Sequence, residues 1–132
     1  MIQTVAKDLI SQKSSGSIVN IASIGALASI DNAMAYCCTK AALDMATKSF
    51  ALELGPHNIR VNSVCPTLIR TPMSEKMFED ENFEKGFVDK TPLGRIGTRN
   101  DIANAVLFML SDLSSMITGV SLRVDGGLLS SI

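Results

Sequence analysis

The chain has 132 residues, of which 46% are hydrophobic and 19% are charged, and its formal net charge is −1. This length suits one folded domain, and the composition is typical of an ordinary globular protein. Because no run of basic residues occurs, the sequence argues against nucleic acid and anionic membranes as partners. No apolar stretch is long enough to span a bilayer, so we expect no membrane span.

The cysteines and the single histidine form no metal-binding pattern. Cys37 and Cys38 are adjacent, Cys65 stands alone, and no C-x-x-C pair occurs. Protein zinc sites usually need four such ligands at short spacings, so we predict no metal. Reduced thiols fit a cytoplasmic location, which is the one that we expect.

The first half of the chain alternates helical and strand-like segments. Residues 1–13 are predicted to form an amphipathic helix with five apolar side chains on one face: Ile2, Val5, Ala6, Leu9 and Ile10. Residues 17–23 ("SIVNIAS") and 58–64 ("NIRVNSV") are rich in β-branched residues and predict buried strands. Between them, residues 33–54 predict a long helix with Asn32 as its N-cap, and Gly55 and Pro56 are expected to end it.

The second half continues the alternation. Pro66 is expected to break the second strand, and the charged residues 73–90 predict one or two helices. Thr98 and Asp101 form a variant of the capping box, which predicts a helix running to about Leu110. Residues 120–127 ("VSLRVDGG") predict a last strand and turn.

Strands that alternate with helices predict an α/β fold with a parallel sheet covered by helices on both faces. Three strands would make a small sheet of this kind. We expect the first strand to lie at an edge of the sheet, which would leave room for further strands encoded upstream.

Tyr36, the chain's one tyrosine, and Lys40 lie four residues apart within the predicted long helix. Residues at this spacing project from the same face of a helix. An ammonium group beside a phenol favours the phenolate, so such a pair is suited to general acid–base catalysis. Taken alone, the Y-x-x-x-K pattern is weak evidence, and the alternative is a half-buried tyrosine with a solvated lysine.

Ser23 strengthens the catalytic interpretation. It ends the first predicted strand, thirteen residues before Tyr36. Open α/β sheets bind their ligands at the C-terminal ends of parallel strands. A hydroxyl at that place can donate a hydrogen bond to a substrate carbonyl and stabilise the charge that develops on its oxygen.

These residues, in this order, resemble the C-terminal half of a short-chain dehydrogenase/reductase. The resemblance rests on "GSIVNIAS", the Y-x-x-x-K pair and "KAALDMATKSFALELGPHNIRVNSVCPTLIRTPM", and it covers essentially the whole chain. It implies the catalytic half of a Rossmann-type, doubly wound parallel sheet. It also implies that Tyr36 exchanges a proton with the substrate oxygen, that Ser23 polarises this oxygen, and that Lys40 supports the tyrosine and binds the nicotinamide ribose.

The resemblance also implies a nicotinamide cofactor. The segment after the second strand is similar to the family's nicotinamide loop, in which Pro66 shapes the turn, the Ile69 backbone meets the carboxamide, and the Thr71 hydroxyl assists. Tyr36 and Lys40 would contact the cofactor as well. The cofactor implied is NADP(H), and NAD(H) remains an alternative because the residues that choose between the two would lie upstream.

Thr67 follows Pro66 where the family usually has glycine, which is similar to the branch that contains L-xylulose reductase and the tetrameric carbonyl reductases. This branch implies a homotetramer that reduces dicarbonyls, ketoses or other ketones. Sugar-reducing members tend to carry polar residues where this chain has Ile24 and Ala33, so a less polar carbonyl compound is an equal alternative.

The family's glycine-rich turn, T-G-x-x-x-G-x-G, and its helix-borne catalytic asparagine have no counterpart in residues 1–132. The chain therefore resembles a truncated enzyme, with the dinucleotide-binding half missing. Three hypotheses follow: an oxidoreductase present as a partial chain, a non-catalytic protein that joins full-length subunits, and a fragment that does not fold alone.

Overall fold

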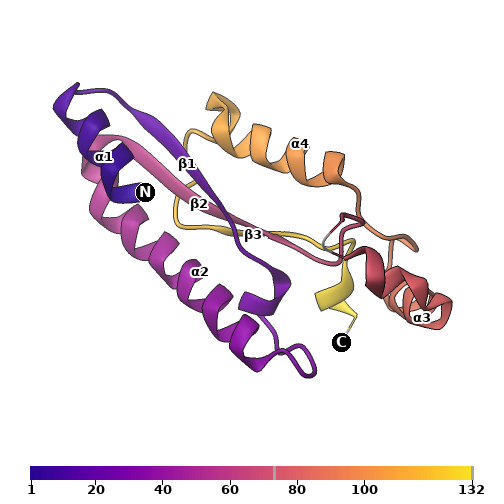
Figure 1. Ribbon diagram of the computed structural model, residues 1–132. Helices are drawn as coiled ribbons and strands as arrows, with labels where there is room; N and C mark the ends of the chain where they lie inside the picture. Colours follow the sequence, from indigo (N-terminus) through magenta and orange to yellow (C-terminus); the bar gives the residue numbers. More distant parts are fainter. Residues whose placement is uncertain (73, 132) are drawn as a thin grey trace.

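The computed structural model describes residues 1–72 and 74–131 as an α/β fold built on a parallel sheet (Figure 1). The three strands stand in the order β1-β2-β3, and each is parallel to its neighbour. Their bounds are Gly16–Ile21 for β1, Ile59–Pro66 for β2 and Ser121–Val124 for β3. The predicted fold class and the edge position of the first strand are confirmed.

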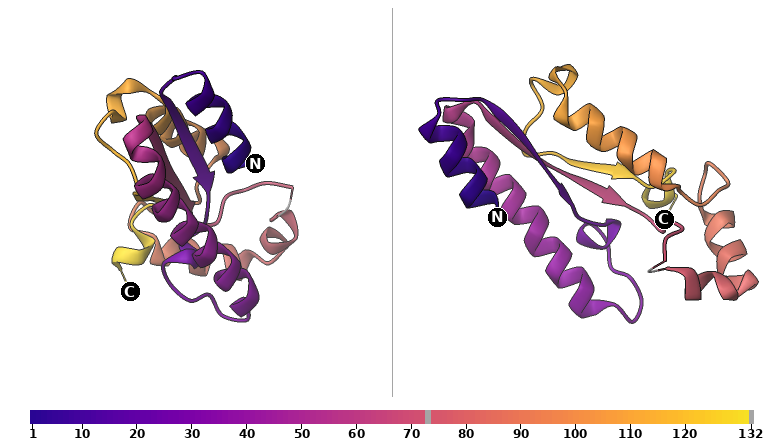
Figure 2. Two further views of the ribbon diagram at one scale, coloured as in Figure 1. Left: turned by 90° about the vertical axis from the view of Figure 1, so that its left-hand side faces the viewer. Right: turned by 45° about the horizontal axis from the view of Figure 1, so that its top comes forward.

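Helices cover both faces of the sheet (Figure 2). The first two, α1 (Ile2–Ser11) and α2 (Met34–Leu54), pack on one face, and α4 (Arg99–Leu110) packs on the other. The short helix α3 (Glu81–Lys90) lies beyond the C-terminal ends of β2 and β3 (Figure 1). This is the layering that a parallel sheet needs, since its strands are buried on both sides.

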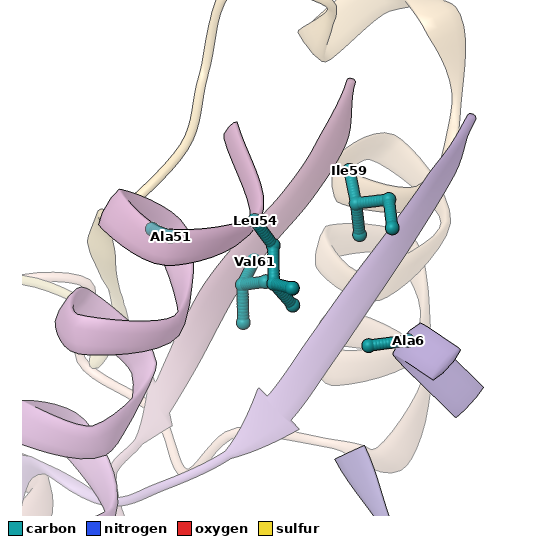
Figure 3. Close-up of a cluster of buried hydrophobic side chains, with 5 residues drawn as sticks. All are labelled: Ala6, Ala51, Leu54, Ile59 and Val61. Carbon is teal, nitrogen blue, oxygen red and sulfur yellow. The ribbon is translucent and has the colours of Figure 1, made fainter. Parts of the chain in front are cut away.

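The hydrophobic core lies between α1, α2 and the sheet. It contains five buried side chains, Ala6, Ala51, Leu54, Ile59 and Val61 (Figure 3). The predicted apolar face of the first helix is confirmed for four of its five members, which pack here, whereas Val5 is 43% exposed. Two of these side chains, Ile59 and Val61, come from the central strand β2. Because full burial of a large aliphatic side chain stabilises a fold by about 1.5–3 kcal/mol, β2 contributes most to this core.

The helix α2 begins differently from the prediction. Its N-cap is Ala33, which makes no side-chain capping bond, and Asn32 precedes it with a φ of 56°. The prediction of Asn32 as the cap was wrong because asparagine also tolerates left-handed backbone, and here it forms the turn before the helix. The other end is as predicted, because α2 ends at Leu54 and a 3₁₀ turn follows over Gly55–His57.

We expected Pro66 to break the second strand. Instead it is the last residue of the strand and pairs with Val124. The amides of Ser63, on β2, and Thr67, just after it, donate to the β3 side, to the carbonyls of Val120 and Val124. The alternate positions, which include Pro66, face β1. Pro66 stands at the last position on that side, so the N–H that it lacks leaves the pairing of β1 with β2, from Gly16–Ile59 to Ile21–Val64, intact.

The secondary-structure predictions for the second half of the chain agree with the structure over its described residues. The charged segment forms a 3₁₀ turn, Glu75–Glu79, and then α3, while Met73, where the predicted segment begins, lies outside the described residues. The predicted capping box is confirmed, since Thr98 Oγ accepts the Asp101 amide and the Asp101 carboxylate accepts the Thr98 amide. No helix within residues 1–72 or 74–131 is both long and apolar enough to cross a bilayer.

Candidate active site

Ser23 lies just past the C-terminal end of β1, where it caps the 3₁₀ turn Ile24–Ala26, called η1 below. Its side chain is almost fully buried, and its Oγ accepts a hydrogen bond from the Gly25 amide at 3.0 Å. A hydroxyl has one hydrogen and two acceptor positions. The bond from Gly25 therefore orients Ser23 without using its hydrogen, which is free to be donated to a ligand.

Tyr36 and Lys40 lie in the first turns of α2, and they share a face as predicted. The Lys40 Nζ is 5.8 Å from the centroid of the Tyr36 ring. It also donates a hydrogen bond to the Ile21 carbonyl, the last residue of β1, at 3.1 Å. Lys40 thus connects the helix to the end of the strand and keeps two further N–H donors.

Gly25 brings these two parts of the site together. A Cβ atom on Gly25 would be 3.3 Å from Cε1 of Tyr36 and 3.3 Å from Sγ of Cys37. The turn η1 therefore packs directly against the first turn of α2, and only glycine leaves the space for it. The structure accordingly gathers Ser23, Tyr36 and Lys40 around the C-terminal end of β1. Tyr36 is 47% exposed, so a ligand can reach it.

The predicted nicotinamide loop leaves the same end of the sheet. Ser23 lies two residues after Ile21, and Pro66 lies two residues after Val64, the register partner of Ile21. The strand ends thus place the start of the loop beside the Ser23 turn, in the position where open α/β sheets bind ligands.

Ser74, which the sequence reasoning missed, organises this loop. Its Oγ accepts the amide of Thr71 at 3.0 Å, donates to the carbonyl of Ile69 at 2.6 Å, and lies 3.2 Å from the Thr71 hydroxyl. Ile69 also pairs with Gly97 in an isolated parallel bridge. A serine three residues after Thr71 was the available signal, because serine hydroxyls often bond to nearby backbone groups in turns.

The three cysteines differ in surroundings. Cys37 packs against Gly25, Cys38 is exposed, and Cys65 is completely buried, where burial raises the pKa of its thiol. Within the described ranges, no group of three or more His, Cys, Asp or Glu side chains is placed to hold a metal ion.

The residues of the site fit the nicotinamide ribose end of a dinucleotide. An ammonium with two free N–H donors, a phenol and an oriented hydroxyl are the groups that bind sugar hydroxyls and a carbonyl oxygen. Lys40 and Tyr36 present the first two from one helix face, and Ser23 presents the third from the adjoining turn.

Comparison with known proteins identifies the class of protein. A family model described as enoyl-(acyl carrier protein) reductase matches residues 1–129. The chain therefore belongs to the short-chain dehydrogenase/reductase family.

Among the curated relatives, mouse L-xylulose reductase is 45% identical over 97% of this chain, and chicken D-erythrulose reductase is 44% identical over 98%. Pig carbonyl reductase [NADPH] 2 is 40% identical over 98%. The match covers 52%, 52% and 53% of these proteins, so the chain spans about half the length of the curated relatives it matches.

Solved structures agree on the fold. The gluconate 5-dehydrogenase of Burkholderia cenocepacia in complex with NADP and tartrate superimposes with a TM-score of 0.94 at 30% identity. The 4-hydroxyisoleucine dehydrogenase complexed with NADH also gives a TM-score of 0.94, at 36% identity. The match covers 98% of this chain in both cases and 51% and 53% of the two structures, so the Rossmann-type fold is matched over half of its extent.

Proposed function

We propose that this chain is the catalytic half of an NADP(H)-dependent oxidoreductase that reduces a carbonyl group to an alcohol. The observation that carries the proposal is the convergence of Ser23, Tyr36 and Lys40 at the end of β1. Its other support is the similarity of the chain to proteins named as reductases of L-xylulose, D-erythrulose and carbonyl compounds.

In this mechanism the Ser23 hydroxyl donates a hydrogen bond to the substrate carbonyl oxygen, since the Gly25 amide already occupies one of its acceptor positions. The Tyr36 phenol gives its proton to the same oxygen as negative charge develops there. Lys40 stabilises the phenolate that remains, while its bond to the Ile21 carbonyl holds the ammonium in place. When bound, the reduced nicotinamide supplies the hydride.

Five residues are proposed to hold the cofactor. Tyr36 and Lys40 bind the ribose, and the loop of Pro66, Ile69 and Thr71 meets the carboxamide end. The order that Ser74 imposes on this loop supports its role as a preformed binding surface. The preference for NADP(H) is supported by the name of the pig relative and by the NADP in the Burkholderia structure, and NAD(H) is the competitor to test.

The substrate proposed is a small dicarbonyl, ketose or other ketone. Ile24, which follows the oriented hydroxyl of Ser23, is a buried residue, and we propose that it forms an apolar wall of the substrate site. This feature favours a less polar carbonyl compound over a polyhydroxylated sugar, because a sugar hydroxyl facing Ile24 would lack a hydrogen-bond partner.

We further propose a cytoplasmic homotetramer for the complete enzyme. Helices α2 and α4 carry exposed apolar side chains of the kind that subunit contacts bury, among them Met45, Leu52 and Leu107 at 60%, 80% and 63% exposure.

The same exposed apolar side chains favour a second candidate function, in which the chain joins full-length subunits without catalysing the reaction. Co-purification of the chain with a complete family member, and changed activity of that member, would support this second function.

The decisive experiment is a titration of the purified chain with NADPH, followed by nicotinamide fluorescence and repeated with NADH. Lys40→Ala should abolish saturable binding, whereas Lys7→Ala, which removes an exposed lysine of α1, should leave it unchanged. If the chain binds NADPH, Tyr36→Phe should then abolish the reduction of a dicarbonyl. Binding that survives Lys40→Ala, or turnover that survives Tyr36→Phe, would refute the roles given to these residues.

A further inference from the structure

A buried carboxylate, Asp44, lies on α2 one turn beyond Lys40 and takes no part in the proposed chemistry. Its side chain is nearly inaccessible at 3% exposure. One carboxylate oxygen accepts hydrogen bonds from two serine hydroxyls, Ser63 of β2 and Ser121 of β3, each at 2.6 Å. The other oxygen forms an ion pair with Lys48 at 2.8 Å.

The two serines are register partners on adjacent strands. A single oxygen of Asp44 therefore joins α2 to both β2 and β3 at once. The strand β2 continues from Ser63 to Pro66 and into the loop of Ile69 and Thr71. The carboxylate thus links the helix that carries Tyr36 and Lys40 with the strand that carries the loop.

Asp44 is also the buried residue of α2 nearest to Tyr36. The buried residues of this helix are Asp44, Thr47, Ala51 and Leu54, and the last two belong to the hydrophobic core at the far end. The first ten residues of α2 are less deeply buried, so their position depends on the packing of η1 against the first turn and on the polar contacts of Asp44 and Lys40. A carboxylate with three partners is well suited to this task, because charge-assisted hydrogen bonds are short and directional.

We infer that Asp44 is a positioning residue, whose bonds to Ser63 and Ser121 set where the Tyr36 end of α2 lies relative to β2 and its loop. The inference that this serves cofactor binding depends on the proposed function. The inference that Asp44 positions the Tyr36 side chain does not depend on the proposed function, because it concerns only the placement of that side chain.

The test uses the absence of tryptophan and the presence of a single tyrosine in the chain. The near-ultraviolet circular dichroism band of tyrosine therefore reports on Tyr36 alone, and the far-ultraviolet spectrum reports independently on helix content. We expect Asp44→Ala to lose the tyrosine band while keeping the helical spectrum. Asp44→Asn, which keeps an oxygen that can accept both serine hydroxyls, should retain the band.

Ser17→Ala is the matched control. It removes a hydrogen bond of 2.9 Å from Ser17 to the Met109 carbonyl, which ties β1 to α4 on the opposite face of the sheet. This variant should lose stability but keep the tyrosine band. Should Asp44→Ala fail to fold, Ser63→Ala removes one of the two donors, and loss of the band in that variant would support the inference equally.

An unchanged band in a folded Asp44→Ala or Ser63→Ala chain would overturn the inference, and so would a wild-type chain without any tyrosine band. If the wild type binds NADPH, Asp44→Ala should weaken binding about tenfold, the equivalent of one lost charge-assisted hydrogen bond, and Asp44→Asn should restore most of it. Absence of NADPH binding to the wild type would count against the proposed function and leave the spectroscopic test of Asp44 intact.

Discussion

The close approach of η1 to α2 makes Gly25→Ala a sensitive probe of the candidate site. The added methyl group would lie 3.1 Å from Cδ1 of Ile30, 3.3 Å from Cε1 of Tyr36 and 3.3 Å from Sγ of Cys37. Carbon atoms in contact prefer separations of about 3.5–4.0 Å, so at least one of these neighbours has to move by a few tenths of an ångström.

The magnitude follows from two opposing effects. Overpacking of this kind costs about 1–3 kcal/mol, while replacing glycine by alanine restricts the unfolded chain and returns about 0.4–1 kcal/mol. The free energy of unfolding should therefore fall by about 1–2 kcal/mol. With a typical urea dependence for a domain of this size, the unfolding midpoint should move down by roughly 0.5–1 M.

Urea titration followed by far-ultraviolet circular dichroism measures this shift, and Gly86→Ala is its matched control. Gly86 lies within α3, and a Cβ there would have no neighbour within 4 Å. That variant should gain up to about 1 kcal/mol from helix propensity. The two substitutions should therefore act in opposite directions. If Gly25→Ala is as stable as wild type or more so, η1 does not pack against Tyr36 as described.

Three further predictions concern other parts of the molecule. The Arg60 guanidinium donates hydrogen bonds to carbonyl and hydroxyl oxygens around the end of α4, the shortest of them 2.8 Å. Arg60→Met removes these bonds and should lower the free energy of unfolding, measured by urea titration, by roughly 2–3 kcal/mol. Burial opposes ionisation of Asp44, but its hydrogen bonds with Lys48 and two serines outweigh this effect and hold its pKa below the usual value. The stabilisation of the folded state by ionised Asp44 should therefore be complete above the unfolded pKa of about 3.9 and disappear as the pH falls through the folded pKa. In thermal unfolding measured against pH, Asp44→Asn should lack this acid-dependent loss of stability. Alkylation followed by mass spectrometry should label exposed Cys38 first and buried Cys65 only on unfolding, so early labelling of Cys65 would contradict the fold.

Much of the fold was predictable because its signals are local. The runs of β-branched residues in β1 and β2 and the capping box of Thr98 and Asp101 each act over a few neighbouring positions. The Y-x-x-x-K pair is equally local, since a helix brings residues four apart onto one face. Asn32 shows the limit of such signals, because the same residue type serves as a helix cap or as a left-handed turn, and the surrounding chain decides between them.

The contacts that complete the site were not predictable in this way. Asp44 meets Ser63 and Ser121 across 19 and 77 residues of sequence, and no periodic pattern connects such positions. Val5 has the same apolar character as its helix neighbours and is nevertheless exposed, because the face that α1 buries depends on where the sheet and α2 lie.

The sequence by itself determined the alternation of strands and helices, since this follows from residue type and short spacing, and its resemblance to the short-chain dehydrogenase/reductases indicated the family and the candidate catalytic groups. The tertiary structure alone decided that the Lys40 ammonium meets the end of β1, that Gly25 admits the Tyr36 ring, and that Ser74 orders the loop after β2. Each of these contacts depends on how separate segments pack, and packing is a property of the assembled layers that no single segment carries.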